Sequence, residues 1–369
     1  MAAGPISNVR DLVLRMPAEW EPHEATWIAW PQNRTDWPGK FALIPWVYAE
    51  IVRHLSRVER VEIILRDAAV ERTARRVLQH AGVGFENIRF HHLPTNRGWL
   101  RDSGPIFVES RYPDGLPAKF PLLITNWRFN AWAKYPDWEL DNAVPEFIAR
   151  HLRVPAIGPE AQTNSGTVKV VLEGGSIDVN GHGTMLTTEE CLLSSIQQRN
   201  PGLTREHLHR VFEQALGVRK VIWLNRGIAG DDTHGHVDDI ARFVTPGTVV
   251  ACVEPDASDP NHEPLAENLW RLRQASDQDG KTLRVVELPM PEPVVFRGQR
   301  LPASYANFYI ANSLVLVPTF NDANDRCALE VLAGVFPDRQ VVGIYCGDLV
   351  WGLGTLHCMT QQQPAPPAG

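Results

Sequence analysis

The chain has 369 residues, of which 44% are hydrophobic and 21% charged, as is usual for a folded protein with a substantial core. Its 36 lysines and arginines against 43 acids leave a net charge of −7, which argues against nucleic acid or an anionic membrane as partner and favours a small cationic ligand. Residues 1–15 lack the apolar core of a signal peptide and no apolar run could span a bilayer, so we expect a cytoplasmic protein.

Short β-rich runs alternate with helical stretches along the whole chain, which predicts an α/β fold. The predicted strands are Val61–Leu65, Ile88–Leu93, Leu122–Thr125, Val168–Leu172, Val218–Leu224, Val249–Val253, Leu283–Leu288, Leu314–Val317 and Val341–Tyr345. The predicted helices, with apolar positions near a 3.6-residue period, are Pro45–Val58, Ala68–Ala81, Leu140–Leu152, Thr188–Gln198, Thr204–Leu216, Pro264–Gln274 and Asp325–Phe336.

Two hairpins are predicted from their turn residues. Ile177–Val179 turns at Asn180-Gly181 into Thr184–Thr187, and Phe308–Ala311 turns near Asn312-Ser313 into Leu314–Val317. The proline-rich loops at 254–264 and 289–293 are too short to be interdomain linkers. Candidate site residues recur at intervals of about 60 to 70 residues, which suggests a structural repeat whose units meet at one common pole.

The five cysteines form no CxxC pair and are odd in number, which favours a reducing compartment over a disulfide framework or a thiolate zinc site. Four of them are expected to pack as small apolar residues: Cys191, Cys252, Cys327 and Cys346. Cys358 differs, because glycines precede it in Gly352-Leu-Gly-Thr-Leu-His-Cys358 and allow close approach of a ligand. Its neighbour His357 is expected to point away from it, as alternate residues of an extended segment do.

Asp102 lies in Arg101-Asp102-Ser-Gly-Pro105, shortly after a predicted strand. One interpretation is a β-turn in which Asp102 accepts local backbone N–H bonds. The other places the Asp102 carboxylate against two N–H groups of a guanidinium. Trp99 could cover the same cation, although core packing is the commoner fate of a tryptophan.

Glu173 ends an apolar strand in Leu172-Glu173-Gly-Gly-Ser176, where a buried charge must be paired or hydrogen-bonded. The segment could simply be the entrance to a hairpin. The paired glycines favour a functional interpretation, because they would clear space beside Glu173 for a ligand or an imidazole.

The densest polar segment is Asp231-Asp-Thr-His-Gly-His-Val-Asp-Asp239. Alternation along an extended chain would put His234, His236 and Asp238 on one face. That face allows His236 to act as general acid and base while Asp238 binds a cation, or it allows all three side chains to hold a divalent metal. A third interpretation is a solvated loop.

Taken together, four segments resemble the signature blocks of the agmatine deiminases, a group within the Porphyromonas-type peptidylarginine deiminase family. They are Trp99-Leu-Arg-Asp-Ser-Gly-Pro105, Leu172-Glu-Gly-Gly-Ser176, Gly230-Asp-Asp-Thr-His-Gly-His-Val-Asp238 and His357-Cys-Met-Thr-Gln-Gln362. Residues 16–31 and 303–312 are similar too, so that the resemblance runs from about residue 16 to 363. Four blocks in the right order are highly specific for the family and less so for one substrate.

The resemblance implies a pentein fold, in which five ββαβ units form an α/β propeller around a central tunnel. It implies a single domain over 1–369, with loose tails at 1–15 and 363–369, and a possible homodimer. The implied activity is hydrolysis of a guanidinium to a ureido group with loss of ammonia, without metal or organic cofactor. For agmatine the products would be N-carbamoylputrescine and ammonia, a step of polyamine biosynthesis.

The roles implied by the family's motifs agree with the chemistry of the groups. Cys358 would attack the guanidinium carbon, and Asp102 and Asp238 would bind the guanidinium nitrogens. His236 would protonate the departing ammonia and then activate water, while Glu173 orients the imidazole or a guanidinium nitrogen. Surrounding carboxylates should raise the pKa of the Cys358 thiol, and a bound cation should restore the balance.

Two departures from the family pattern leave the substrate open. Gly352-Leu-Gly-Thr-Leu-His-Cys358 differs from the usual Gly-Gly-Gly-Asn-Ile-His-Cys, and Asp239 stands where asparagine is frequent. Arginine, peptidyl-arginine or another guanidino compound is therefore a second candidate substrate. Two more distant readings of the residues are a metal-dependent ureohydrolase that uses His234, His236 and Asp238, and a guanidine-binding module without turnover.

Overall fold

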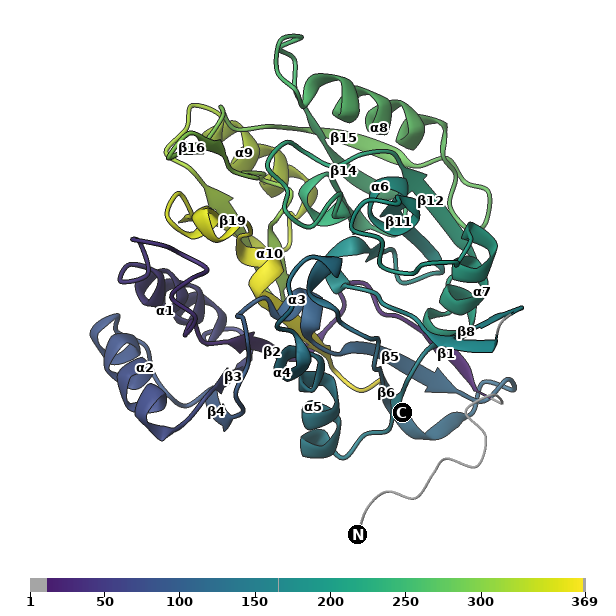
Figure 1. Cartoon of the computed structure of the whole chain (residues 1–369), viewed down its shortest axis with the longest axis horizontal. Coiled ribbons are helices and arrows are strands. Elements are labelled where there is room, and N and C mark those ends of the chain that lie inside the picture. Colours follow the sequence, from purple (N-terminus) through teal and green to yellow (C-terminus); the bar gives the residue numbers. More distant parts are fainter. Residues whose placement is uncertain (1–11, 165, 368–369) are drawn as a thin grey trace.

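The computed structural model describes residues 12–164 and 166–367 and has a mixed α/β fold (Figure 1). Five sheets of three or four strands account for most of the β-structure. In strand order they are β21 (Thr360–Pro364), β2 (His23–Ala29), β3 (Arg60–Leu65) and β4 (Ile88–His92); β1 (Val13–Arg15), β5 (Ile106–Arg111), β6 (Pro117–Thr125) and β7 (Ala156–Ile157); β10 (Asp178–Val179), β11 (Thr184–Thr188) and β12 (Lys220–Leu224); β13 (Ala241–Thr245), β14 (Thr248–Val253) and β15 (Arg284–Pro289); and β18 (Tyr309–Ala311), β19 (Leu314–Thr319) and β20 (Gln340–Tyr345). Two small ribbons complete the β-structure: β8 (Glu160–Thr163) with β9 (Gly166–Lys169), and β16 (Val295–Phe296) with β17 (Gln299–Arg300).

The helices are α1 (Ile44–Leu55), α2 (Ala68–His80), α3 (Leu100–Ser103), α4 (Glu139–Asn142), α5 (Val144–Leu152), α6 (Glu189–Leu193), α7 (Arg205–Leu216), α8 (His262–Gln274), α9 (Asp325–Val335) and α10 (Leu356–Met359). Most helices connect strands of one sheet, whereas α3 and α10 lie in connections between sheets. Single 3₁₀ turns lie at η2 (Ala131–Ala133), η3 (Gly174–Ser176), η4 (Val237–Asp239) and η5 (Leu349–Gly352). Asp67 caps α2 by accepting hydrogen bonds from two backbone N–H groups, and Gly217 ends α7 in the left-handed conformation.

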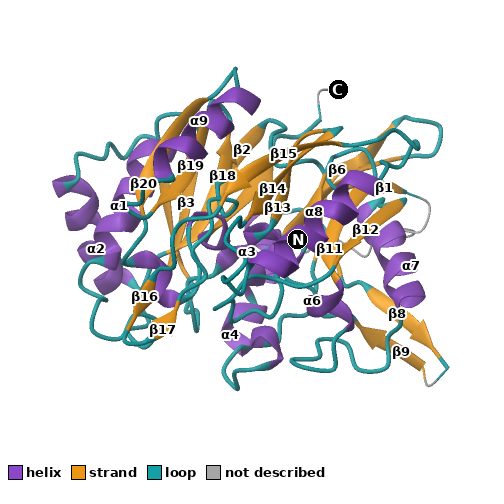
Figure 2. Cartoon of the chain, turned by 90° about the horizontal axis from the view of Figure 1, so that it is seen from above, coloured by secondary structure: helices purple, strands orange, loops and turns teal. Residues whose placement is uncertain are grey.

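One connection pattern recurs in four of the five sheets, whereas in the fifth the antiparallel partner of β2 is β21, from the C-terminal segment. An antiparallel pair comes first, and a helix then crosses over to a third, parallel strand, as in β13, β14, α8 and β15. The same pattern joins β10, β11 and β12 through α7, and β18, β19 and β20 through α9. Each crossover helix buries an apolar stripe against its sheet, and a fully buried aliphatic side chain contributes about 1.5–3 kcal/mol. Figures 1 and 2 show α3 in the middle of the molecule, with α2 and α7 toward the outside.

The sequence predicts the long helices and both hairpins well. In the first hairpin Asp178 pairs with Leu186, and in the second Tyr309 pairs with Leu316. The predicted helix Leu140–Leu152 is divided at Ala143 into α4 and α5, because Pro145 begins a new helix there. The predicted helix Thr188–Gln198 ends at Leu193, because Ser194 has an extended backbone conformation.

The C-terminal tail predicted at 363–369 is wrong in its first residues. Strand β21 extends to Pro364 and pairs antiparallel with β2, so that the end of the chain completes a sheet begun near its start. Gln363 is buried and accepts a hydrogen bond from the indole Nε1 of Trp27 at 2.9 Å. At the other end, Val13–Arg15 form β1, while residues 1–11 lie outside the described residues. The sequence failed here because Gln361, Gln362 and Gln363 give no apolar signal.

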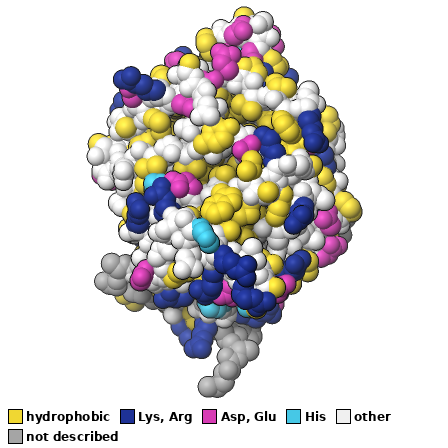
Figure 3. All heavy atoms as spheres, turned by 90° about the vertical axis from the view of Figure 1, so that its left-hand side faces the viewer, with side chains coloured by type: hydrophobic (Ala, Val, Ile, Leu, Met, Phe, Trp, Pro, Cys, Tyr) yellow, Lys and Arg dark blue, Asp and Glu magenta, His cyan; other side chains and the backbone are white. Residues whose placement is uncertain are grey.

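The outer surface carries one feature of note. Figure 3 views the molecule from the side of α1 and α2, where hydrophobic side chains gather over the middle of the face. Leu43 and Trp46, at the start of α1, are each about half exposed.

Within the described ranges, none of the helices combines the length and apolar character needed to cross a bilayer.

The Trp27–Gln363 hydrogen bond predicts the effect of Gln363→Ala. Loss of the acceptor leaves a buried indole N–H unsatisfied, which should lower the free energy of unfolding by about 1–3 kcal/mol. Denaturant unfolding measures the change, with Gln79→Ala on the exposed face of α2 as the matched control. A Gln363→Ala protein as stable as the Gln79→Ala control would contradict the structural role of β21.

Candidate active site

Four short helical turns carry the predicted site residues. Asp102 lies in α3, Glu173 immediately precedes η3, His236 and Asp238 lie at η4, and Cys358 lies in α10. In space α3 packs against α10 and η3, and η3 packs against η4. Residues far apart in the sequence therefore meet in the interior of the protein.

Gly175 lies where three of these side chains converge. A Cβ atom at this position would lie 2.6 Å from His236 Nδ1, 2.7 Å from Asp102 Oδ1 and 3.0 Å from Asp238 Oδ2. The predicted role of the paired glycines, to clear space in front of an imidazole, therefore holds for Gly175. His236 Nδ1 has no hydrogen-bond partner, and neither has Oδ1, the other carboxylate oxygen of Asp238, although both residues are buried. A buried carboxylate oxygen without a partner is costly, so the site favours a ligand that donates hydrogen bonds.

Cys358 borders the same group of side chains. Its Sγ lies 3.7 Å from Asp238 Oδ2 and 3.1 Å from the amide Nδ2 of Asn307. Gly354 separates it from Trp99, because a Cβ atom at Gly354 would lie 3.1 Å from Cys358 Sγ and 3.0 Å from the Trp99 ring. Trp99 is thus a wall of the site and not part of a distant core.

The electrostatic environment of Cys358 disfavours the thiolate. Burial raises the pKa of the thiol well above its usual value, and the charges of Asp238, Asp239 and Asp102 raise it further. The hydrogen bond from Asn307 acts in the opposite direction. The predicted increase in the pKa of the thiol is therefore confirmed, with Asp239 as an additional cause.

His236 lies between two carboxylates. Its Nδ1 is 3.7 Å from Asp102 Oδ1, and its Nε2 is 3.7 Å from Glu173 Oε2. Burial alone would lower the pKa of the imidazole, but the charge of Asp102 and the contact with Glu173 raise it well above its usual value. The surroundings of the imidazole therefore favour its protonated form.

Glu173 is held by a buried arginine that the sequence gave no reason to select. Arg199 Nε donates to Glu173 Oε1 at 3.1 Å, and both side chains are fully buried. Although burial raises the pKa of Glu173, the Arg199 charge and the contact with His236 lower it to about 2. Glu173 thus remains an anion beside Nε2 of the imidazole.

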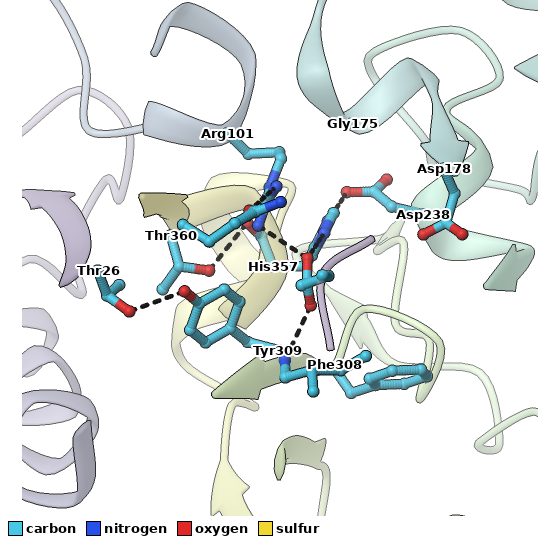
Figure 4. A network of polar contacts seen from close by, with 12 residues as sticks. Thr26, Arg101, Gly175, Asp178, Asp238, Phe308, Tyr309, His357 and Thr360 are labelled. Atoms are coloured by element: carbon cyan, nitrogen blue, oxygen red, sulfur yellow. Dashed lines mark hydrogen bonds and ion pairs between the residues drawn. The ribbon is translucent and has the colours of Figure 1, made fainter. Parts of the chain in front are cut away.

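Asp238 is held by a second imidazole, that of His357 (Figure 4). His357 Nδ1 lies 2.7 Å from Asp238 Oδ2, and its Nε2 lies 2.8 Å from Glu19 Oε2. Burial raises the pKa of Glu19, but the charges of Arg242, His357 and Arg101 lower it well below its usual range. His357 therefore lies between two buried carboxylates, with one ring nitrogen against each.

The extended segment expected around His357 is wrong, because residues 356–359 form one helical turn that directs consecutive side chains differently. Glu19 was not selected either, and its only signal was its place in the family-like opening segment.

Asp102 is fixed by an unusual turn. Trp132 Nε1 donates to Asp102 Oδ2 at 2.9 Å, and Gly175 N donates to Oδ1 at 3.0 Å. Trp132 and its two neighbours all have positive φ, at 49°, 57° and 54°, a conformation that non-glycine residues adopt at a cost. This strained turn brings the indole N–H of Trp132 to the Asp102 carboxylate and so positions it. Burial raises the pKa of Asp102 to about 6, despite the opposing charge of His236.

The predicted shared face of His234, His236 and Asp238 is wrong. His234 has a φ of 65° and its Nε2 contacts Ser194 Oγ at 3.2 Å, while η4 replaces the expected strand. In the part of the chain that the structure describes, the one group of three ligand-type atoms lying within 4.8 Å of one another is Glu173, Cys191 and His236. His234 and Asp238 do not belong to it.

The other cysteines follow the prediction in part. Cys191, Cys252 and Cys346 are buried, but Cys327 is exposed on α9, which corrects its expected packing in the core. Cys191 lies beside His236 and Glu173, at the edge of the site.

Comparisons with known proteins agree with this geometry. The sequence profile of the Porphyromonas-type peptidyl-arginine deiminases matches residues 15–364. An agmatine deiminase of Medicago truncatula is 37% identical over 95% of this chain and 96% of its own length. The solved agmatine deiminase of Enterococcus faecalis superposes with a TM-score of 0.85 at 31% identity, covering 98% of this chain and 99% of that one. A cysteine-to-serine variant of the C. jejuni agmatine deiminase with substrate bound superposes with a TM-score of 0.82 at 28% identity, covering 96% and 97%.

A mixed α/β fold with a buried thiol, imidazole and carboxylates defines a class of enzymes that act on a cationic carbon. Within that class, the chain belongs to the Porphyromonas-type peptidyl-arginine deiminase family.

The raised pKa of Asp102 predicts a pH-dependent stability difference for Asp102→Asn. The folded-state pKa is about 6 and the reference value 3.8, so ionisation of Asp102 destabilises the folded protein as the pH rises through this range. Asparagine does not ionise. From pH 4 to pH 7, the free energy of unfolding of the variant should therefore rise relative to wild type by about 2 kcal/mol.

Denaturant unfolding at several pH values measures this difference, and Asp338→Asn on the surface controls for the loss of one carboxylate. Lost hydrogen bonds to Trp132 and Gly175 change the offset between Asp102→Asn and wild type, but they do not change its slope with pH. A constant offset from pH 4 to pH 7 would contradict the assigned environment of Asp102.

Proposed function

We propose that this protein hydrolyses agmatine to N-carbamoylputrescine and ammonia through a covalent intermediate on Cys358. The observation that carries this proposal is the convergence of His236 Nδ1, Asp102 Oδ1 and Asp238 Oδ2 around Gly175, next to a cysteine. His236 Nδ1 and Asp238 Oδ1 are buried there without a hydrogen-bond partner. The agmatine deiminases among its relatives support agmatine as the substrate.

The guanidinium is bound by carboxylates on opposite edges. Its planar, forked N–H groups match carboxylate oxygens in pairs, a role we assign to Asp102 and Asp238. Trp99 lies beside Cys358 and covers one face of the cation. Positive charge in the site also offsets the repulsion among the buried carboxylates, so substrate binding stabilises groups that are costly in the free protein.

The reaction then proceeds in two halves that both use His236. The Cys358 thiolate attacks the guanidinium carbon and forms a C–S bond, and His236 gives its proton to the departing nitrogen, which leaves as ammonia. Neutral His236 then takes a proton from water, which attacks the same carbon. The C–S bond breaks, its electron pair returns to sulfur, and the ureido product leaves.

Glu173 acts on the imidazole and not on the substrate in this mechanism. Its Oε2 faces His236 Nε2, while Oε1 is occupied by Arg199, so that one oxygen remains to hold the ring proton. His236 Nδ1 is then the atom that exchanges protons with substrate and water. His357 positions Asp238 in the same way, through the bond between its Nδ1 and Asp238 Oδ2.

The geometry of the site gives less support to the alternative functions. A metal-dependent ureohydrolase would need His234, His236 and Asp238 together, and His234 contacts Ser194 instead. Arginine or peptidyl-arginine as substrate would call for a basic group opposite a carboxylate, or for space for a peptide. The agmatine deiminases among the relatives favour agmatine over both.

The expected fold, domain organisation and compartment are proposals too. Five sheets, four of which share one connection pattern, support the five ββαβ units of a pentein propeller in a single domain. Five free cysteines support a reducing, cytoplasmic compartment. The homodimer and the absence of any cofactor stay predictions.

A product assay tests the proposed activity. Wild type should release ammonia and form N-carbamoylputrescine from agmatine faster than from arginine or a peptidyl-arginine, and the rate should survive chelation of divalent metal. Cys358→Ala should lower the rate by at least about a thousandfold, because the nucleophile is lost. Urea as the product, or turnover in Cys358→Ala, would overturn the proposal.

The carboxylates around Cys358 predict that the bound cation promotes ionisation of its thiol. Titration of thiolate absorbance should show a lower apparent pKa in the presence of an unreactive cationic analogue of the substrate, because the positive charge offsets Asp238 and Asp102. Subtraction of the same titration of Cys358→Ser removes the signal of the other four cysteines. An apparent pKa that does not change on binding would refute substrate-assisted ionisation.

A further inference from the structure

Asn307 contacts Cys358 although none of the motif-derived roles includes it. It lies in the family-like segment 303–312, just before β18, and its side chain is buried. The amide takes part in five hydrogen bonds, all to residues of the Cys358 loop or to Asp239. This density of bonds around one side chain next to the nucleophile requires a functional explanation.

The orientation of the Asn307 amide is fixed by its oxygen. Oδ1 accepts from the hydroxyl of Thr355 at 2.7 Å and from the backbone N–H groups of His357 at 3.1 Å and Cys358 at 3.4 Å. Backbone N–H groups can only donate, so the atom that faces them is the oxygen. A flipped amide would place its NH₂ group against these donors.

The nitrogen of the amide must therefore face Cys358. Nδ2 lies 3.1 Å from Cys358 Sγ and 3.0 Å from Asp239 Oδ1, and its two hydrogens serve one acceptor each. A neutral thiol is a weak acceptor, whereas a thiolate is a strong one, because hydrogen bonds to charged groups are the stronger kind. The hydrogen bond from Asn307 Nδ2 to Cys358 Sγ is therefore strongest when the sulfur carries a negative charge.

We propose that Asn307 is a catalytic residue of this enzyme that donates a hydrogen bond to the Cys358 thiolate. The inference rests on the proposed nucleophilic role of Cys358. In the first half-reaction the bond stabilises the thiolate before its electron pair forms the C–S bond. In the second half it stabilises the same sulfur as a leaving group, when the C–S bond breaks and the electron pair returns.

The surroundings explain why such a donor is needed. Asp238, Asp239 and Asp102 all oppose a negative charge on sulfur. No other hydrogen-bond donor to Cys358 Sγ is found among the described residues. Before the substrate arrives, the amide of Asn307 is therefore the one contact in the described structure that favours the ionised thiol by direct donation.

A merely structural role, in which Asn307 holds the loop of residues 355–358, makes a different prediction. Asn307→Asp keeps an oxygen for the three loop bonds and loses the donor to sulfur. Asn307→Leu loses the donor without adding charge. Thr355→Val removes one loop bond to the amide but leaves the donor in place.

The test is the pH dependence of Cys358 alkylation by iodoacetamide, which requires no turnover and so remains readable if agmatine is not the substrate. It is done in a Cys327→Ser background, because Cys327 is exposed and would react. Asn307→Asp and Asn307→Leu should slow alkylation at pH 7 by roughly ten- to a hundredfold, with the profile displaced upward by about one to two pH units. Thr355→Val should keep the wild-type profile.

Each outcome decides the question. Profiles of both Asn307 variants that match wild type would overturn the proposal, as would an equal displacement in Thr355→Val. Circular dichroism of the nearly isosteric Asn307→Asp establishes that the fold persists. Product assays then separate the two halves, because a poorer leaving group should make the covalent adduct accumulate in Asn307→Leu relative to wild type.

Discussion

The buried negative charge beside Cys358 is the constraint on which the site depends. Asp102, Asp238 and Glu173 are each almost fully removed from water, and two of them are aimed at a space that Gly175 keeps open. Burial of a carboxylate without a partner costs several kcal/mol. The free protein tolerates this cost because each acid is held by a hydrogen-bond partner on the side away from the open space. A planar cation bound in that space offsets the cost.

The groups behind the acids alternate in charge. Glu173 is backed by Arg199, and Asp238 by His357, which is in turn backed by Glu19. Glu19 also contacts Arg101 and Arg242, whose guanidinium reaches Asp178. Asp102 is the exception, since it is held by neutral donors, the Trp132 indole and the Gly175 N–H. That difference explains why its pKa is raised while those of Glu173 and Asp238 are lowered.

Sequence reasoning located the site residues whose segments carry charge, glycine and histidine in compact motifs. It predicted that the paired glycines leave room for a ligand or an imidazole, and Gly175 faces the His236 imidazole. It missed Trp132 and Arg199, which come from segments without such motifs, and Asn307, which lies in a family-like segment but contacts Cys358 only through the tertiary fold. It also misjudged the backbone at His357 and His234, since a one-turn helix and a left-handed residue direct side chains differently from an extended strand. Strands β2, β5 and β21 were missed because their polar residues conceal the alternating pattern.

The pairing of β21 with β2 has a consequence for how the protein is made. The antiparallel partner of residues 23–29 is residues 360–364, which a ribosome adds long after β2 has been made. Until then β2 has only its parallel neighbour β3, and Cys358, two positions before β21, has not been joined to the rest. A nascent chain that has not reached Cys358 thus holds a nearly complete set of acids and arginines without the thiol beside them.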